Sequence, residues 1–295
     1  MNWEVIAFMV IVASCCIVLS LQRHDLYQGP RTPPRGVVPS GELRRMPLRK
    51  TVWLLWFQGW DDAPWLVRNV RASWELLNPQ WDIVSLSDDN LEEYMPPDVM
   101  ALLLKNADTM SPAAKSDLIR LNLLANQGGV WADATMVCMQ PLDAWVHDAI
   151  QPSGFWMYHG RDEGAGPASW FMVSKKGSYI ACAWRDEAVR YWKSRTEAHN
   201  YFWMDELFKT VHDNDDTFKH EWARVPYTWC EDPGQSHMLA QKVMDNDPEL
   251  HRIMYEDPPY AIKLSHHGFD ESKESNGYHA IQAALRRAHH IATPT

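Results

Sequence analysis

The chain has 295 residues, of which 46% are hydrophobic and 22% are charged, enough to bury one substantial core or two small ones. Its formal net charge of -10 argues against a nucleic-acid partner, because phosphate binding needs a basic surface. The 16 tryptophans exceed what a core normally needs, and indole rings stack on sugars and bases. For any single tryptophan, core packing remains the commoner role.

An almost unbroken apolar run covers Val5 to Leu21 and is followed at once by Arg23. Its length is at the lower limit for a helix that spans a bilayer. A cleaved signal peptide and a buried core helix are the alternatives, but a signal peptide should begin with basic residues, and none precedes the run. We therefore predict a single-pass membrane anchor over residues 1–22.

The next segment, residues 23–50, is rich in proline, glycine and arginine and lacks hydrophobic periodicity. This composition predicts a flexible or semi-extended stem. The other interpretation is a basic strip lying on anionic lipid. Both interpretations place the start of the folded domain near Lys50, so that the domain covers residues 51–295.

The first folded segment predicts a strand, a helix and a second strand. Thr51 to Phe57 is a continuous apolar, β-rich run, as in a central strand covered on both faces. Ala63 to Leu77 has helical spacing, and Trp81 to Leu86 is again strand-like. This order and spacing predict a right-handed parallel unit, and hence an α/β fold.

The most informative segment is SPAAKSDLIRLNLLANQGGVWADATMVCMQPLDAW. A helix is expected over Ala113 to Asn126, and Gly128 and Gly129 end it. A short strand then leads to Asp133, and Thr135 to Met139 is β-rich. Ligands of open α/β sheets bind outside the carboxyl ends of strands, so Asp133 is the leading site candidate. Its alternative role is to accept local amides in a turn.

Four more side chains are candidates by position. Asp117 and Arg120 are three residues apart and so share one helix face, where a surface ion pair is the alternative interpretation. Trp53 and Trp56 lie on the first strand and point to opposite faces. One of them could stack on a nucleotide base, although core packing explains both.

At these residues the chain resembles the capsular polysaccharide synthesis proteins, which are relatives of glycosyltransferase family 32 and of the glycosyltransferase toxins. Four segments match in order: VWLLWFQGWDDAPWLVRNVRASWELLNPQWDIVSLSDDN, AAKSDLIRLNLLANQGGVWADATM, ASWFMVSKKGSYIACAWRDEAVRYW and the weaker YAIKLSHHG. The resemblance implies a GT-A fold, a Rossmann-like sheet with helices on both faces. It also implies a hexosyltransferase-type enzyme that uses a nucleotide sugar, typically UDP-linked, and a glycan or polysaccharide acceptor.

The resemblance assigns roles by position. Asp117 and Arg120 would hold the ribose and phosphate side of the nucleotide. Gly128 and Gly129 would let the backbone turn closely beneath the donor, and Asp133 would touch the sugar or a metal. The reaction implied is attack of an acceptor hydroxyl on the anomeric carbon, with retention of configuration, while a metal or basic groups stabilise the departing nucleoside diphosphate.

The resemblance further implies a divalent metal, Mn²⁺ or Mg²⁺, held by an Asp-x-Asp motif. Here the motif reads Asp133-Ala134-Thr135, and a hard cation prefers a carboxylate to a hydroxyl, which puts metal dependence in doubt. His266 and His267 follow the strand-like YAIKLS and are candidates for a late metal or phosphate ligand. An exposed pair of loop histidines is the equally good alternative.

Three residues complete the predicted site. Ser169 and Trp170, in PASWFMVSKK, would line the acceptor side by resemblance. Asp205, in YFWMDELF, is a candidate general base on a segment whose aromatic residues also fit core packing. A rival function is a non-catalytic, membrane-tethered carbohydrate-binding protein on a degenerate transferase fold. A phosphate-handling hydrolase is a weaker rival, because the chain lacks a phosphate loop.

The orientation of the predicted anchor is left open. Basic residues follow the apolar run and none precedes it, so the positive-inside rule places the large C-terminal part in the cytoplasm. Many Golgi glycosyltransferases have the opposite, type II orientation, with the catalytic part in the lumen. The two criteria disagree.

Overall fold

The computed structural model describes residues 33–159, 168–228, 255–267, 269, 271–273 and 275–292. Its main sheet has the strand order β2-β1-β3-β6-β5. Strand β1 is parallel to β2 and β3, whereas β6 is antiparallel to β3 and β5. The strands are β1 (Thr51–Leu55), β2 (Asp82–Leu86), β3 (Gly129–Ala132), β5 (Phe155–Met157) and β6 (Phe171–Ser174). The fold is therefore mixed α/β with a parallel-containing sheet.

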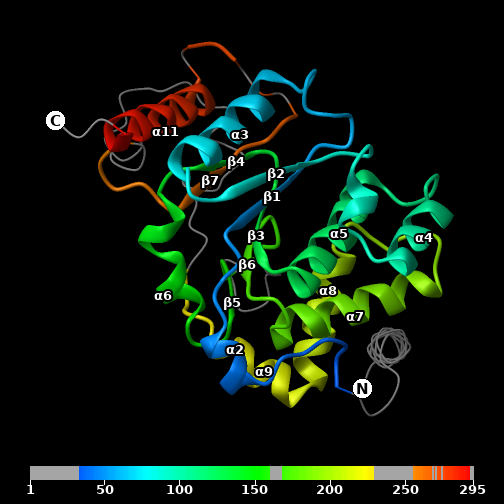
Figure 1. The fold of residues 1–295 in the computed structure, drawn as a ribbon. Helices are drawn as coiled ribbons and strands as arrows, with labels where there is room; N and C mark the ends of the chain where they lie inside the picture. The colour runs from blue at the N-terminus through cyan, green and yellow to red at the C-terminus, as the bar shows by residue number, and fades with distance from the viewer. Residues whose placement is uncertain are drawn as a thin grey trace, which may run out of the picture.

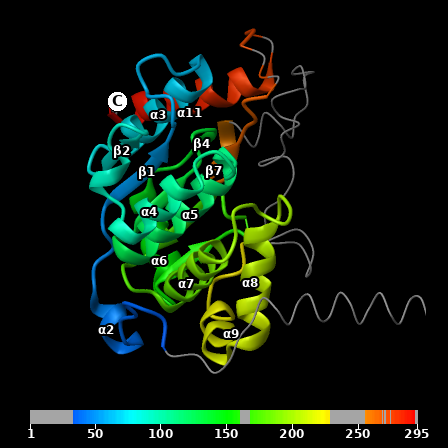
Figure 2. The same cartoon turned by 90° about the vertical axis from the view of Figure 1, so that its right-hand side faces the viewer.

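A separate antiparallel pair joins β4 (Met136–Cys138) to β7 (Ala261–Lys263). The helices are α2 (Ser40–Arg45), α3 (Trp65–Leu77), α4 (Pro97–Lys105), α5 (Pro112–Asn126), α6 (Val146–Ile150), α7 (Tyr179–Lys193), α8 (Trp203–Asn214), α9 (Asp216–Trp222) and α11 (Asn276–Ala292). Helix α3 packs against α11, and α5 packs against α7, which also contacts α8 and α9. Figures 1 and 2 show these two helix groups in different parts of the molecule.

The predicted parallel unit is confirmed, with shorter elements. Strand β1 ends at Leu55, two residues before the predicted end. Helix α3 begins at Trp65, because Pro64 has extended backbone angles, φ -53° and ψ 153°, and is the N-cap residue.

Tryptophan fills much of the core. Among the described residues, seven indoles are less than 2% exposed: Trp53, Trp74, Trp131, Trp156, Trp184, Trp192 and Trp203. Several also donate to backbone carbonyls, as Trp74 does to Met136 over 2.7 Å. The high tryptophan content is therefore explained in large part by packing.

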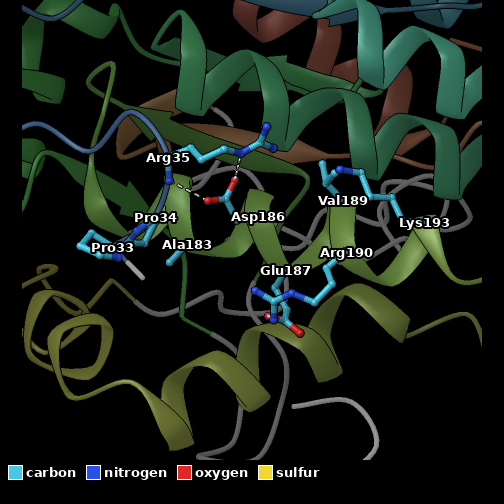
Figure 3. A pocket seen from close by; sticks show the side chains of 9 residues that line it. All are labelled: Pro33, Pro34, Arg35, Ala183, Asp186, Glu187, Val189, Arg190 and Lys193. Atoms are coloured by element: carbon cyan, nitrogen blue, oxygen red, sulfur yellow. Dashed lines mark hydrogen bonds and ion pairs between the residues drawn. The ribbon is translucent and has the colours of Figure 1, made fainter. Parts of the chain in front are cut away.

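The segment predicted as a stem carries regular structure in its second half. Ser40–Arg45 form α2, and Leu43 is buried. Before that helix, the Arg35 backbone N–H donates to Asp186 on α7 over 2.7 Å. Figure 3 shows this contact at a hollow of about 340 Å³ that contains none of the predicted site residues. The contacts are tertiary, and a local proline- and glycine-rich composition does not reveal them.

The anchor predicted for residues 1–22 lies outside the described residues. Within the part of the chain that the structure covers, the helices are too short or too polar to cross a bilayer. The division into anchor, stem and domain, and both membrane orientations, stay predictions.

Candidate functional site

Asp133 lies at the carboxyl end of β3, as predicted. Strand β3 ends at Ala132, the Asp133 N–H donates to the Trp170 carbonyl over 2.9 Å, and the Asp133 carbonyl accepts from the Met136 N–H over 2.8 Å. The chain therefore turns at Asp133 between β3 and β4. Since β1 is parallel to β3, the loops that follow both strands share this edge of the sheet.

Cationic groups hold both oxygens of the Asp133 carboxylate. Oδ1 accepts from Arg120 Nη2 at 3.1 Å and from Trp131 Nε1 at 3.0 Å, and Oδ2 accepts from Lys263 Nζ at 2.7 Å. Burial alone would raise the pKa of Asp133, but the charges of Lys263 and Arg120 outweigh it and lower the pKa. Asp133 is therefore a fixed anion that orients two cations.

Arg120 links helix α5 to the loop before β6. Its side chain is only 7% exposed, lies 3.2 Å from Asp117 Oδ1, and donates through Nη1 to the carbonyl and hydroxyl oxygens of Ser169 at 3.1 and 3.0 Å. The predicted pairing of Asp117 with Arg120 is confirmed. Arg120 is buried and the Asp117 side chain is only 16% exposed, so the pair is more enclosed than a surface ion pair.

Ser169 and Trp170, predicted on the acceptor side, lie directly beside Asp133. Ser169 accepts from Arg120, and the Trp170 carbonyl accepts the Asp133 N–H. Both residues belong to the turn that enters β6. This turn therefore fixes the carboxylate and the guanidinium together.

Two further carboxyl groups lie near Arg120. Burial raises the pKa of Asp117 to about 6; Arg120 opposes this rise, and Asp133 adds to it. Burial also raises the pKa of Asp205, on α8, to about 7, and the charge of Asp117 contributes to the rise. A carboxyl group with a pKa near neutrality can accept a proton at physiological pH, as a general base must.

Lys263 completes the site, and sequence reasoning did not select it. Its ammonium lies 2.7 Å from Asp133 Oδ2 and 2.9 Å from Thr135 Oγ1, and the side chain is 12% exposed. The antiparallel register that pairs Lys263 with Met136 brings it there. The available signal was its place in the last matching segment, YAIKLSHHG, three residues before His266.

His266 and His267 are exposed, and the His266 ring lies 5.2 Å from the ring of Trp56, which is half-buried. Trp56 follows β1, so both rings lie beyond the carboxyl end of that strand. Across the described ranges, no group of three or more His, Cys, Asp or Glu side chains is arranged to hold a metal ion. The predicted metal role of the histidine pair therefore gains no support from its surroundings.

The residues of the Asp-Ala-Thr motif also fit a divalent metal poorly. Both oxygens of Asp133 already accept from cations or an indole N–H, and the Thr135 hydroxyl accepts from Lys263. A hard cation of this kind needs several free oxygen ligands. In this arrangement an ammonium occupies the space between the two motif side chains.

Gly128 and Gly129 lie at the other end of β3 from Asp133. Their φ angles are +73° and +103°. A Cβ would come within 2.6 Å of Lys176 N at Gly128 and of Thr51 O at Gly129. Trp53, predicted as a possible base platform, is fully buried and donates to the Gly128 carbonyl over 2.9 Å. Close backbone packing accounts for the two glycines and core packing for Trp53, and the donor contacts expected of all three stay predictions.

The family model described as capsular polysaccharide synthesis protein matches residues 42–280, and the chain belongs to that family. The glycosyltransferase AfumC of Aspergillus fumigatus is 29% identical over 48% of this chain and 38% of its own length. The O-glycosyltransferase PaGT of Phomopsis amygdali is 24% identical over 53% and 42%. The putative glycosyltransferase HOC1 of Saccharomyces cerevisiae is 26% identical over 52% and 40%.

The match thus spans about two fifths of the length of each of these curated relatives. Among solved structures, the PaToxG glycosyltransferase is similar with a TM-score of 0.44 and 12% identity, over 60% of this chain and 75% of that one. That structural likeness is distant.

Proposed function

We propose that this chain is a glycosyltransferase that moves a hexose from a nucleotide sugar to a hydroxyl of a glycan or polysaccharide. Membership of the family and the names of the relatives support glycosyl transfer. The observation that carries the proposal is the meeting of Asp133, Arg120 and Lys263 at the carboxyl end of β3. The GT-A assignment of the sheet is part of the same proposal.

The charges of the site suit a donor that carries a diphosphate. Arg120 and Lys263 are cations held in fixed positions by Asp133, and a guanidinium or an ammonium binds phosphate oxygens well. Trp56 offers a half-buried indole face beyond β1, where a base such as uracil could stack. In this proposal Asp133 also accepts hydrogen bonds from hydroxyls of the transferred sugar.

In the proposed reaction, the acceptor oxygen forms a bond to the anomeric carbon. The bond from that carbon to the diphosphate oxygen breaks, and its electron pair leaves with the nucleoside diphosphate. The acceptor proton passes to Asp205, whose raised pKa of about 7 suits a base at neutral pH. Retention of configuration, expected from the resemblance, is part of the proposal and requires the acceptor oxygen to enter on the face of the sugar from which the diphosphate leaves; no step depends on a metal.

A panel of UDP- and GDP-sugars tests the proposal by thermal shift and by donor hydrolysis, each with Mn²⁺ and with EDTA. A donor that binds the folded protein raises its melting temperature by mass action. We expect one donor class to raise it in the wild type, to be slowly hydrolysed, and to lose both effects in Asp133→Asn. Glycan binding without turnover of any donor would instead favour the non-catalytic carbohydrate-binding protein.

A further inference from the structure

The space between Asp133 and Thr135 holds the ammonium of Lys263. The ammonium lies 2.7 Å from the carboxylate of one and 2.9 Å from the hydroxyl of the other. These are the two side chains at the positions where an Asp-x-Asp motif would present its metal ligands. The lysine comes from β7, an element distant in sequence, and the register with β4 fixes its place.

This ammonium is equipped to contact a further anion. It has three N–H donors, and Asp133 and Thr135 accept from it in the part of the chain that is described. Its side chain is 12% exposed, so it is held by the fold and still borders solvent. Asp133, which it contacts, is also paired with Arg120, and Arg120 in turn lies 3.2 Å from Asp117 Oδ1, so each cation of this cluster is fixed by a carboxylate.

A metal at the same position would meet two obstacles. It would have to displace Lys263 from Asp133 Oδ2, or else bind close to an ammonium of like charge. It would also have to displace Lys263 from the Thr135 hydroxyl, the second motif ligand. A divalent ion binds such an occupied pair less well than two free carboxylates.

We propose that Lys263 takes the place of the divalent metal, so that its ammonium, together with Arg120, stabilises the nucleoside diphosphate as it leaves. The inference rests on the proposed function. As the bond from the anomeric carbon to the diphosphate oxygen breaks, the electron pair moves to that oxygen, and the remaining N–H of Lys263 donates to the diphosphate. A preorganised cation of this kind stabilises the charge that develops in the transition state.

Nucleotide binding by the full chain tests this inference without relying on turnover. Calorimetry with UDP, and separately with GDP, is run on the wild type in EDTA and in Mn²⁺. We expect one of the two to bind equally in both conditions. Lys263→Met should weaken that binding at least about tenfold, and Lys263→Arg, which keeps a cation, should restore most of it.

The control is Lys50→Met. The Lys50 ammonium also lies close to an aspartate, 2.8 Å from Asp143 Oδ2, but this pair is outside the site. This variant should bind the nucleotide as the wild type does.

Electron paramagnetic resonance of Mn²⁺ gives a second readout. The wild type should leave the ion free, whereas Thr135→Asp combined with Lys263→Met, which presents two carboxylates and no ammonium, should bind it.

The outcomes separate the two proposals. A nucleotide that binds the wild type only when Mn²⁺ is present overturns the role of Lys263 and leaves the proposed function standing. Binding of Mn²⁺ by the wild type, if it is lost in Asp133→Asn, likewise overturns the role of Lys263 and leaves the proposed function standing. Failure of both UDP and GDP to bind the wild type in either condition overturns the proposed function, and the inference with it.

Discussion

The two ends of strand β3 meet different requirements, although only four residues separate them. At the N-terminal end, Gly128 and Gly129 have positive φ angles and touch neighbouring backbone, and Trp53 is fully buried. At the C-terminal end, Asp133 is partly exposed and lies between two cations. With a rise of about 3.3 Å per residue, the strand keeps these ends roughly 13 Å apart.

The contrast shows that one short motif, GGVWAD, joins a packing element to a charged site. Substitutions at the glycine end should act on folding, because they force backbone atoms apart. Substitutions at the aspartate end should act first on ligand binding and transfer, because they remove a charge that the ligand meets. Two measurements test this division, and a third tests the carboxyl groups of α8, one of which is close to the aspartate end of the site.

The largest effect is expected at the glycine end. Gly129→Ala should lower the free energy of unfolding by about 4 kcal/mol, because a Cβ would lie 2.6 Å from Thr51 O and φ is +103°. Gly59→Ala is the matched control: its φ is +89°, but no atom lies within 4 Å of the added Cβ, so strain alone should cost about 1–2 kcal/mol. Chemical denaturation measures both. Equal losses in the two variants would contradict the packing role.

Asp133→Asn should have the next largest effect. We expect transfer to fall at least about hundredfold, which corresponds to about 2.7 kcal/mol of transition-state stabilisation. The control is Asp143→Asn, since Asp143 also accepts from a lysine, Lys50, and from an indole, Trp81. Asp143 is 42% exposed, so its loss should leave transfer unchanged and cost less than about 1 kcal/mol of stability. Assays of initial rate and of unfolding separate the two aspartates, and similar losses of transfer would count against a special role for Asp133.

The smallest effect is a dependence of stability on pH. Because the pKa of Asp205 is raised to about 7 in the folded state, folding favours its protonated form. Its ionisation therefore costs stability in full above pH 7, and this cost disappears as pH falls toward the ordinary aspartate pKa. Asp205→Asn should melt at a higher temperature than the wild type at pH 8, and the difference should shrink between pH 7 and pH 4.

Asp213, on the same helix, should change the stability with pH in the opposite direction. Burial opposes its ionisation, but hydrogen bonds from His212 and Lys209 outweigh this and lower its pKa. Its charge therefore adds stability above the ordinary aspartate pKa, and the addition is lost as pH falls through the lowered folded value. Asp213→Asn should melt slightly below the wild type at pH 8. If Asp205→Asn and Asp213→Asn shift the melting temperature at pH 8 in the same direction relative to the wild type, the opposite pKa shifts assigned to the two residues are contradicted.

Sequence reasoning succeeded where the signal was local. The apolar run of β1, the helix that carries Asp117 and Arg120, and the position of Asp133 after a short strand are each encoded in contiguous residues. The resemblance assigned donor contacts to Gly128 and Gly129, and these stay predictions; a glycine pair near a site motif does not reveal which neighbouring atoms require it. Here the nearest neighbours are backbone atoms of Lys176, just after β6, and of Thr51 on β1.

Non-local contacts could not be predicted in the same way. Lys263 is 130 residues from Asp133 in sequence, and only the register of β7 with β4 joins them. Asp205 was a candidate by its position alone, and its proximity to Asp117 and Arg120 depends on how α8 packs. The contacts of Arg35 with α7 are of the same kind. A single sequence does not contain the pairing information that would identify them.

The pairing of β4 with β7 has a consequence for how the protein is made. The carboxylate of Asp133 is synthesised 130 residues before the ammonium that balances it. A growing polypeptide that has left the ribosome up to α9 already contains every strand of the main sheet, but it lacks β7. The charged centre is therefore assembled late, after most of the sheet can form, and any product that ends between residues 133 and 262 carries Asp133 without its lysine.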